Sequence, residues 1–239
     1  MIIQKRNELE AIKAIRSNLQ KALSPEEFTK ILSEYLELQT VYSAAMKEIE
    51  TKLEILDSEF RYRYKRNPIH RIQTRLKTPR SIANKLMRKG ITEGLEQNKI
   101  RDAIKDIAGI RVICQYIDDI YTIAELLTRQ DDLTVVKISD YIKQPKENGY
   151  RSYHMILNVP VFFAETTEHV NVEVQIRTIA MDCWASLEHE LKYKNPEDVP
   201  TEIKARLLEC AEEIAETDAK MQDIYKTLYV LESNGEEDE

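Results

Sequence analysis

Residues 172–177 show the clearest alternation of hydrophobic and polar positions in the chain. The run Val-Glu-Val-Gln-Ile-Arg alternates strictly, so a β-strand there would bury its three aliphatic residues on one face. Glu173, Gln175 and Arg177 would then lie together on the opposite face. A carboxylate, an amide and a guanidinium on one surface indicate a binding site, although an ordinary solvated face of an antiparallel sheet would show the same alternation.

The middle of the chain alternates between strand-like and helix-like periods. Strands are expected at residues 106–116, 134–139, 151–160 and 169–177, and helices at residues 79–89, 118–130 and 178–194. The last two strands should be antiparallel. This order predicts an α+β fold, in which a mixed β-sheet carries helices on one face.

Two long helices are predicted on either side of this core. Apolar residues repeat with heptad spacing over residues 28–60 and again over residues 203–231. Ser24 and Pro25 supply a cap for the first of them. A helix at residues 4–23 would precede it, and a frayed acidic tail would follow Ser233. The two apolar seams either pack within one protomer or join protomers.

These boundaries suggest three parts of the chain: N-terminal helices at residues 1–60, a core domain at residues 61–195, and a C-terminal helix with its acidic tail at residues 196–239. No stretch reaches the roughly 18 apolar residues of a membrane span. The start of the chain lacks a signal peptide, so we expect a cytoplasmic protein. The three cysteines show no metal-site spacing and are expected to be reduced.

Positive charge is concentrated in one segment. The chain has a net charge of −7, yet residues 61–89 contain 11 of its 35 Lys and Arg residues and no Asp or Glu. A segment of this kind is expected to bind phosphate. The pI of about 5.4 argues against coating of nucleic acids or membrane surfaces. A small anionic ligand is therefore expected.

Two further polar clusters add candidate chemistry. Asn148-Gly149 indicates a turn leading into a strand with aromatic and basic side chains. Asp106 and Arg111 open another strand, and a β-bulge at Gly109 would bring both side chains to the same face. Asp106 together with Glu173 would suit Mg²⁺, which nucleotide enzymes bind with one or two carboxylates plus substrate phosphates.

In chain order these motifs resemble the synthetase domain of the RelA/SpoT superfamily. They are Arg75-Leu-Lys77 with Ser81, Lys85 and Arg88; Asp106 to Arg111; Glu147 to His154; Val172 to Thr178; and Trp184 to His189. The resemblance covers about residues 60–195 and is greatest to the RelP group of small alarmone synthetases, then to the RelQ group.

The resemblance implies a fold, an activity and an assembly. The fold would be a nucleotidyltransferase-like mixed sheet. The activity would be that of a GTP/GDP pyrophosphokinase, which transfers the β,γ-pyrophosphate of ATP to the 3′-hydroxyl of GDP or GTP. Its products are AMP and (p)ppGpp, the alarmone of the stringent response. Mg²⁺ would be the cofactor, and the chain would form a homo-oligomer, with a tetramer expected.

The resemblance also implies residue roles. Asp106 and Glu173 would bind Mg²⁺ and act in catalysis, with Glu173 taking the 3′-hydroxyl proton. ATP would be bound through adenine by Arg75 and Arg111 and through its phosphates by Lys77, Ser81, Lys85 and Arg88. GDP or GTP would be bound by Lys146, Tyr150, His154, Gln175, Arg177 and Asp182, with Tyr150 stacked on guanine.

The sequence departs from the family at two positions. Asp182 replaces an Asn that many relatives carry, and its carboxylate can still accept from guanine N1–H and the 2-amino group. Ser139 replaces a basic residue, which reduces the expected contacts to the acceptor phosphates and leaves open whether GDP or GTP is preferred. The chain has no His-Asp dipeptide, so no hydrolase activity is expected.

Two other classes of function fit parts of the pattern. A single-stranded RNA-binding regulatory protein would use the basic segment with Tyr62 and Tyr64 as stacking surfaces. A scaffold built on the heptad helices would explain those helices but not the polar face that contains Glu173. RNA binding would be secondary to the enzyme activity.

Overall fold

The computed structural model describes residues 25–91, 97–194 and 199–235. Its core is a five-stranded sheet in the order β1-β2-β5-β4-β3. The strands are β1 (Ile69–Leu76), β2 (Ala108–Cys114), β3 (Thr134–Asp140), β4 (Tyr153–Phe162) and β5 (Thr167–Thr178). β2 runs parallel to β5, and the other neighbouring pairs are antiparallel. The predicted α+β fold with a mixed sheet is confirmed, as is the antiparallel pairing of β4 and β5.

The described helices are α2 (Pro25–Tyr64), α3 (Pro79–Arg88), α4 (Gln97–Ala103), α5 (Ile117–Thr128), α6 (Ile179–Lys194) and α7 (Thr201–Gly235). All but α4 were expected, with ends that differ by a few residues. The acidic tail was predicted to begin after Ser233, whereas α7 continues through Gly235. The helix predicted at residues 4–23 and the cap at Ser24 lie outside the described residues.

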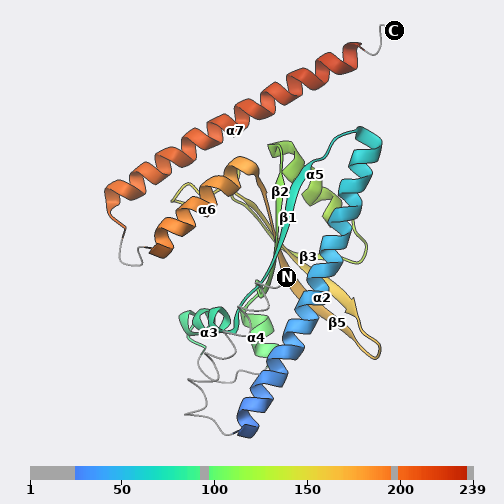
Figure 1. The fold of residues 1–239 in the computed structure, drawn as a ribbon, viewed down its shortest axis with the longest axis vertical. Helices are drawn as coiled ribbons and strands as arrows, with labels where there is room; N and C mark the ends of the chain where they lie inside the picture. Colours follow the sequence, from blue (N-terminus) through green and yellow to red (C-terminus); the bar gives the residue numbers. More distant parts are fainter. Residues whose placement is uncertain (1–24, 92–96, 195–198, 236–239) are drawn as a thin grey trace.

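One face of the sheet packs against α2 and α5. The aliphatic side chains of β5, Val172, Val174 and Ile176, are fully buried there. Tyr42 and Ile49 of α2 join the same core, so burial of apolar surface fixes the helix on the sheet. In Figure 1, α2 lies on one side of the sheet and α3 and α6 lie on the other. Helices therefore cover one face, as expected, and flank the second.

The expected β-bulge at Gly109 is absent from β2. Residues 108–114 pair without a register shift with both β1 and β5. A bulge in a strand that is paired on both sides would disrupt two hydrogen-bond ladders at once. Asp106 instead lies in the turn before β2, so the alternation of the strand does not dictate its direction. The register shift in the pairing of β1 with β2 occurs instead in the edge strand β1, between Ile69 and Arg71.

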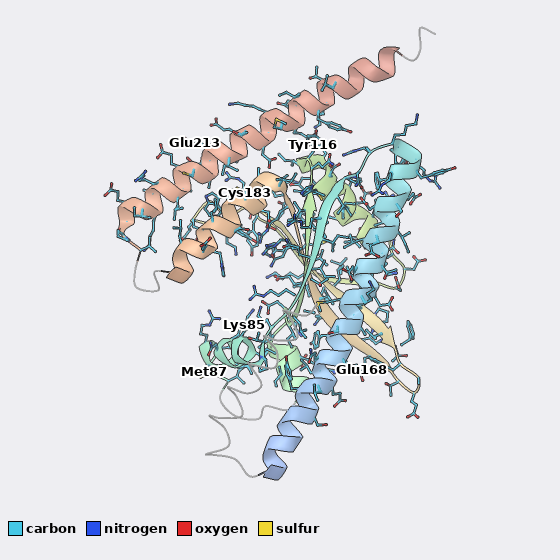
Figure 2. All side chains as sticks on the ribbon, viewed as in Figure 1. Lys85, Met87, Tyr116, Glu168, Cys183 and Glu213 are labelled. Atoms are coloured by element: carbon cyan, nitrogen blue, oxygen red, sulfur yellow. The ribbon has the colours of Figure 1, made fainter. Side chains whose placement is uncertain are left out.

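Helix α7 packs against α6 and α5 at one end of the molecule and extends past both (Figure 1; with side chains, Figure 2). Four of its large apolar side chains are exposed in the single chain: Ile203, Met221, Ile224 and Leu228. Among the described helices, none combines the length and hydrophobicity needed to cross a membrane.

Candidate functional site

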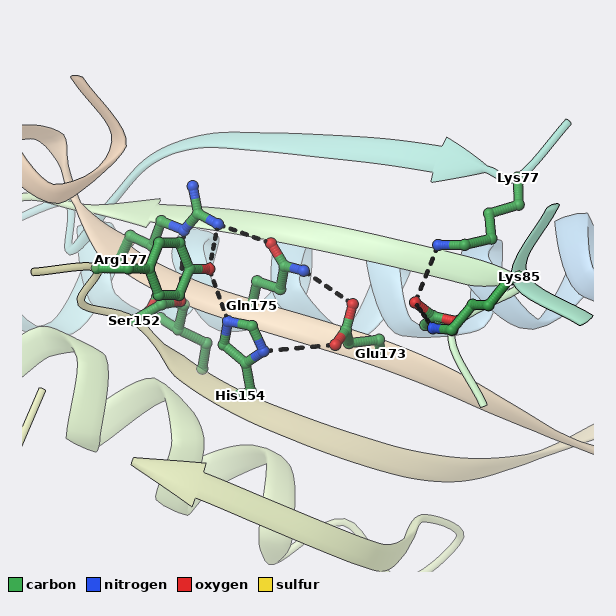
Figure 3. Close-up of polar contacts among 10 residues, drawn as sticks. Lys77, Lys85, Ser152, His154, Glu173, Gln175 and Arg177 are labelled. Carbon is green, nitrogen blue, oxygen red and sulfur yellow. Dashed lines mark hydrogen bonds and ion pairs between the residues drawn. The ribbon is translucent and has the colours of Figure 1, made fainter. Parts of the chain in front are cut away.

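The uncovered face of β5 carries the three polar residues that the alternation predicts. The Gln175 amide donates to Glu173 Oε2 at 2.8 Å and accepts from an Arg177 guanidinium nitrogen at 2.9 Å. Figure 3 shows the three side chains in a row along the strand. Each residue holds the next, so the row presents a fixed carboxylate at one end and a fixed guanidinium at the other.

His154 and Tyr150 close this row into a ring of polar contacts. β4 places His154 opposite Gln175, and its Nδ1 lies 3.4 Å from Glu173 Oε1. Its Nε2 lies 2.8 Å from the Tyr150 hydroxyl, which accepts from Arg177 at 2.5 Å. Because a guanidinium only donates, the Tyr150 proton is free to point to Nε2. His154 thus joins the Tyr150 hydroxyl to the Glu173 carboxylate (Figure 3).

These contacts set the charge of Glu173. Burial raises the pKa of its carboxyl, but the hydrogen bond and charge of His154 and the hydrogen bond from Gln175 outweigh burial, so the pKa lies below its ordinary value. Glu173 is therefore a carboxylate at neutral pH. Such a group can bind a cation or receive a proton.

Asp106 lies at the other end of the site with two lysines. Its Oδ2 accepts from Lys77 Nζ at 2.9 Å and from Lys85 Nζ at 2.7 Å, as Figure 3 shows for the two lysines. Burial raises the pKa of Asp106, but the hydrogen bonds and charges of the two lysines lower it by a larger amount. The net shift of the pKa is therefore downward. Its Oδ1 is buried and has no hydrogen-bond partner among the described residues.

A pocket of about 440 Å³ opens between these groups. Gly109 pairs with Arg75 on one side and with Glu173 on the other, and its missing side chain leaves the hollow open. Six of the predicted site residues line the pocket: Arg75, Lys77, Asp106, Arg111, Glu173 and Gln175.

Three arginines gather beside this pocket. Burial lowers the pKa of Arg111, and the nearby charges of Arg177 and Arg75 lower it further. Asp182, in the first turn of α6, forms ion pairs with Arg111 and with Arg177, at 3.2 Å each. One carboxylate does not neutralise three guanidinium groups, so the cluster is suited to an anionic ligand.

The turn before β4 completes the site. Lys146 Nζ lies 4.7 Å from the centre of the Tyr150 ring and 4.6 Å from that of Tyr141. Gly149 adopts a left-handed backbone conformation with φ of 84°, which the Asn-Gly step predicts. The turn thus places a cation beside an aromatic ring, at the edge of the polar face.

Comparison with known proteins decides the family. The model for the region found in RelA/SpoT proteins matches residues 74–198. GTP pyrophosphokinase YwaC of Bacillus subtilis is 45% identical over 186 residues, which are 78% of this chain and 88% of that protein. The chain belongs to the RelA/SpoT family.

Solved structures of RelA/SpoT family members agree with this assignment. Small alarmone synthetase 2 from Bacillus subtilis aligns with a TM-score of 0.71 and 44% identity, over 79% of this chain and 97% of that one. Small alarmone synthetase 1 from the same organism, bound to its product pppGpp, aligns with a TM-score of 0.74 and 36% identity, over 81% of this chain and 97% of that one.

Three residues that the RelA/SpoT resemblance suggests for ATP do not line the pocket: Ser81, Lys85 and Arg88. Lys85 donates to Asp106 at the edge of the pocket. The Ser81 hydroxyl accepts from Thr78, which caps α3. Arg88 is exposed and donates to the Asn84 carbonyl of its own helix at 3.4 Å. Their ATP roles remain predictions.

Three residues in the site were not expected from the sequence. Gln73 accepts from Arg111 at 3.5 Å, and buried Ser152 accepts from Arg177 Nε at 3.3 Å. Tyr141 packs edge-on against His154. Gln73 could have been found from the alternation of residues 71–76, but the other two depend on how β4 and its preceding turn fold.

Metal binding would depend on the carboxylate pair. The described parts of the chain contain no group of three or more His, Cys, Asp or Glu side chains placed to hold a metal ion. Asp106 and Glu173 nevertheless line the same pocket. The donor set fits an ion that takes its remaining ligands from water and substrate phosphates, as Mg²⁺ does.

Proposed function

We propose that this chain is a GTP pyrophosphokinase that transfers the β,γ-pyrophosphoryl group of ATP to the 3′-hydroxyl of GDP or GTP. The products are AMP and (p)ppGpp. One observation carries the proposal: Glu173 lies between an arginine- and lysine-lined pocket and the turn that contains Tyr150. A donor nucleotide and an acceptor nucleotide can therefore meet at one carboxylate.

In the proposed donor half, Arg75 and Arg111 provide guanidinium planes for adenine. Lys77 and Lys85 are directed to Asp106 in the single chain, and their ammonium groups would neutralise the ATP phosphates. Phosphoryl transfer asks the protein mainly for positioning and for compensation of charge. The pocket residues supply both.

In the proposed acceptor half, Tyr150 stacks on guanine and Asp182 recognises its N1–H and 2-amino group. Lys146 is exposed beside the Tyr150 ring and would reach the 5′-phosphates together with His154. Gln175 orients the ribose. Arg177 is only 4% exposed, so it contributes to this orientation by holding Gln175 and Tyr150 in place.

Glu173 would receive the proton of the 3′-hydroxyl. Its pKa is held below the ordinary value, so the group is deprotonated at neutral pH and carries no proton that must leave first. The transferred group is a pyrophosphoryl unit: the new bond joins the 3′-oxygen to the β-phosphorus, and the bond from the β-phosphorus to the α-phosphate oxygen breaks. AMP leaves with that oxygen.

Asp106 and Glu173 are the residues that would hold Mg²⁺. The buried Asp106 Oδ1 without a hydrogen-bond partner is the observation that favours such a ligand. When bound, Mg²⁺ neutralises charge on the transferred phosphates. The protein contributes the two carboxylates and the lysines around them.

The proposed assembly is a homotetramer. Met221 and Leu228 of α7 are 49% and 55% exposed in the single chain, whereas Ile214 packs onto the cluster around Trp184. A row of exposed apolar side chains on a heptad helix suits burial between protomers. The RNA-binding alternative gains no support from the relatives, which are named as pyrophosphokinases or alarmone synthetases.

The direct test is a transfer assay. The purified chain is incubated with Mg²⁺, γ-labelled ATP and either GDP or GTP, and the nucleotides are separated. We expect label in a guanosine product and AMP in equal amount, and no labelled product when the guanine nucleotide is omitted. Label released only as free phosphate would contradict the proposal.

A further inference from the structure

Helix α7 contacts the acceptor half of the site at two places, through residues that the proposed mechanism does not use. The first contact involves the turn that carries Lys146 and Tyr150. Gly149 of this turn is buried against Ala211, and a Cβ atom at Gly149 would lie 2.5 Å from the Ala211 Cβ. An Arg151 guanidinium nitrogen donates to the carbonyls of both Gly149 and Ala211, at 3.2 and 3.3 Å.

The turn is also internally closed. The Gly149 amide donates to the Lys146 carbonyl at 2.8 Å, and the Lys146 amide donates to the Tyr150 carbonyl at 3.2 Å. Since the turn is a closed unit seated on Ala211, a shift of α7 at this point moves Lys146 and Tyr150 together.

The second contact involves the end of β5. The Thr178 hydroxyl donates to Asp218 of α7 at 2.6 Å and accepts from the Met181 amide at 3.1 Å. Thr178 directly follows Arg177 and caps the start of α6, which carries Asp182. Asp218 is only 6% exposed. A buried carboxylate therefore fixes the junction between β5, which carries Arg177, and α6, which carries Asp182.

We infer that α7 positions the guanine-nucleotide half of the site, with Ala211 and Asp218 as positioning residues. The inference rests on the proposed function for its assignment of the two halves. Most of the donor half lies elsewhere: Lys77 and Lys85 each contact Asp106, and of the two proposed adenine residues only Arg111 pairs with Asp182. Among the described helices, α7 packs on α6 and α5, so loosening it should weaken acceptor binding more than ATP binding.

Kinetics of Asp218 variants separate this role from a general structural one. Asp218→Ala removes the acceptor of the Thr178 hydroxyl and should raise KM for GDP about tenfold, with KM for ATP within about twofold of its original value. Asp218→Asn keeps an oxygen that can accept and should restore KM for GDP. Asp223→Asn, at an exposed position of the same helix, is the matched control and should change neither value.

Ala211→Gly provides a second variant, because it removes the methyl group against which the turn rests while leaving the buried hydrogen bond of Asp218 in place. It should also raise KM for GDP and not KM for ATP. Equal effects on both substrates, or no effect of Asp218→Ala and Ala211→Gly on either, would overturn the inference.

Trp184 gives a readout that needs neither turnover nor a variant. It is the single tryptophan of the chain, is buried at the contact of α6 and α7, and donates to the Leu207 carbonyl at 3.0 Å. GDP should change its emission in a saturable way, and α,β-methylene ATP should not. GDP binding seen by calorimetry without any change in emission would overturn the inference. Absence of transfer in the unaltered enzyme would instead overturn the proposed function, and the titration would still report on α7.

Discussion

Glu173 is the residue on which the proposed donor and acceptor halves converge. Its two carboxylate oxygens have separate partners, His154 on one and Gln175 on the other. These partners hold the carboxylate in one orientation and keep it ionised. Replacing the charged Glu173 carboxylate should therefore affect the proposed reaction more than the stability of the fold.

Glu173→Gln should leave the circular dichroism spectrum unchanged and reduce turnover at least about 100-fold, which is roughly 3 kcal/mol of transition-state stabilisation. The amide removes both a metal ligand charge and the proton acceptor. Glu165→Gln, at an exposed position between β4 and β5, is the control. Near-normal turnover of the Glu173 variant would exclude the proposed role.

Arg75 and Tyr150 should affect different nucleotides. Arg75 lines the donor pocket, so Arg75→Ala should weaken binding of α,β-methylene ATP in calorimetry. Tyr150→Ala should weaken GDP binding by about 1–3 kcal/mol if the ring stacks on guanine. Arg129→Ala, at the exposed end of α5, should alter neither. Reversed or equal effects would refute the assignment of the halves.

The pH dependence of stability follows from Asp106. Its pKa is lowered in the folded state by Lys85 and Lys77 against the effect of burial. This group therefore stabilises the fold above its unfolded pKa of about 4, and the contribution is lost as pH falls through the lower folded value. Lys85→Met should reduce the free energy of unfolding at neutral pH, and the difference from the original protein should shrink in acid. A pH-independent difference would contradict this cause.

At the scale of elements, substitutions at two glycines distinguish the effect of close packing against α7 from the effect of backbone strain. Gly149 and Gly90 both have positive φ, at 84° and 72°. Only Gly149 has atoms within 4 Å of the position a Cβ would take. Both Ala variants should lose about 1 kcal/mol from backbone strain, and Gly149→Ala should lose a further 1–3 kcal/mol, roughly, from overpacking. Equal losses in denaturant unfolding would argue against the close packing of α7.

The elements that the sequence predicted well are those with a long or strict period. Hydrophobic and polar residues alternate along β5, and apolar residues recur with heptad spacing over many turns of α2 and α7. β1 was missed because its register shift between Ile69 and Arg71 breaks the alternation at the start of the strand. α4 has only seven residues, too few for a helical period to be recognised.

The site residues were assigned by resemblance, and the structure adds what sequence spacing cannot provide. Gln175 and Arg177 could be placed on one face, but their link to Tyr150 depends on the pairing of β4 with β5. Asp106 reaches the pocket because it lies before β2, not through the bulge that was expected at Gly109. Contacts between distant segments, such as Thr178 with Asp218, leave no periodic signal in the sequence.

At the scale of the whole molecule, the exposed seam of α7 predicts the oligomeric state. Met221→Glu with Leu228→Glu would place unpaired charges in an apolar interface and should dissociate it. Light scattering should then show a smaller species that keeps its helical circular dichroism. Lys220→Glu, on an exposed polar position of α7, should leave the mass unchanged. A monomeric original protein at micromolar concentration would contradict a tetramer.

One site is proposed to transfer a pyrophosphoryl unit between two nucleotides, and the identity of the adenosine product distinguishes this reaction from other phosphoryl transfers. The enzyme is incubated with Mg²⁺, ATP and GDP, and the products are quantified by phosphorus NMR and chromatography. We expect AMP and, in equal amount, a guanosine nucleotide with a diphosphate on its 3′-oxygen. Formation of ADP together with GTP would mean transfer of a single phosphoryl group to the 5′ end, and would contradict the proposed reaction.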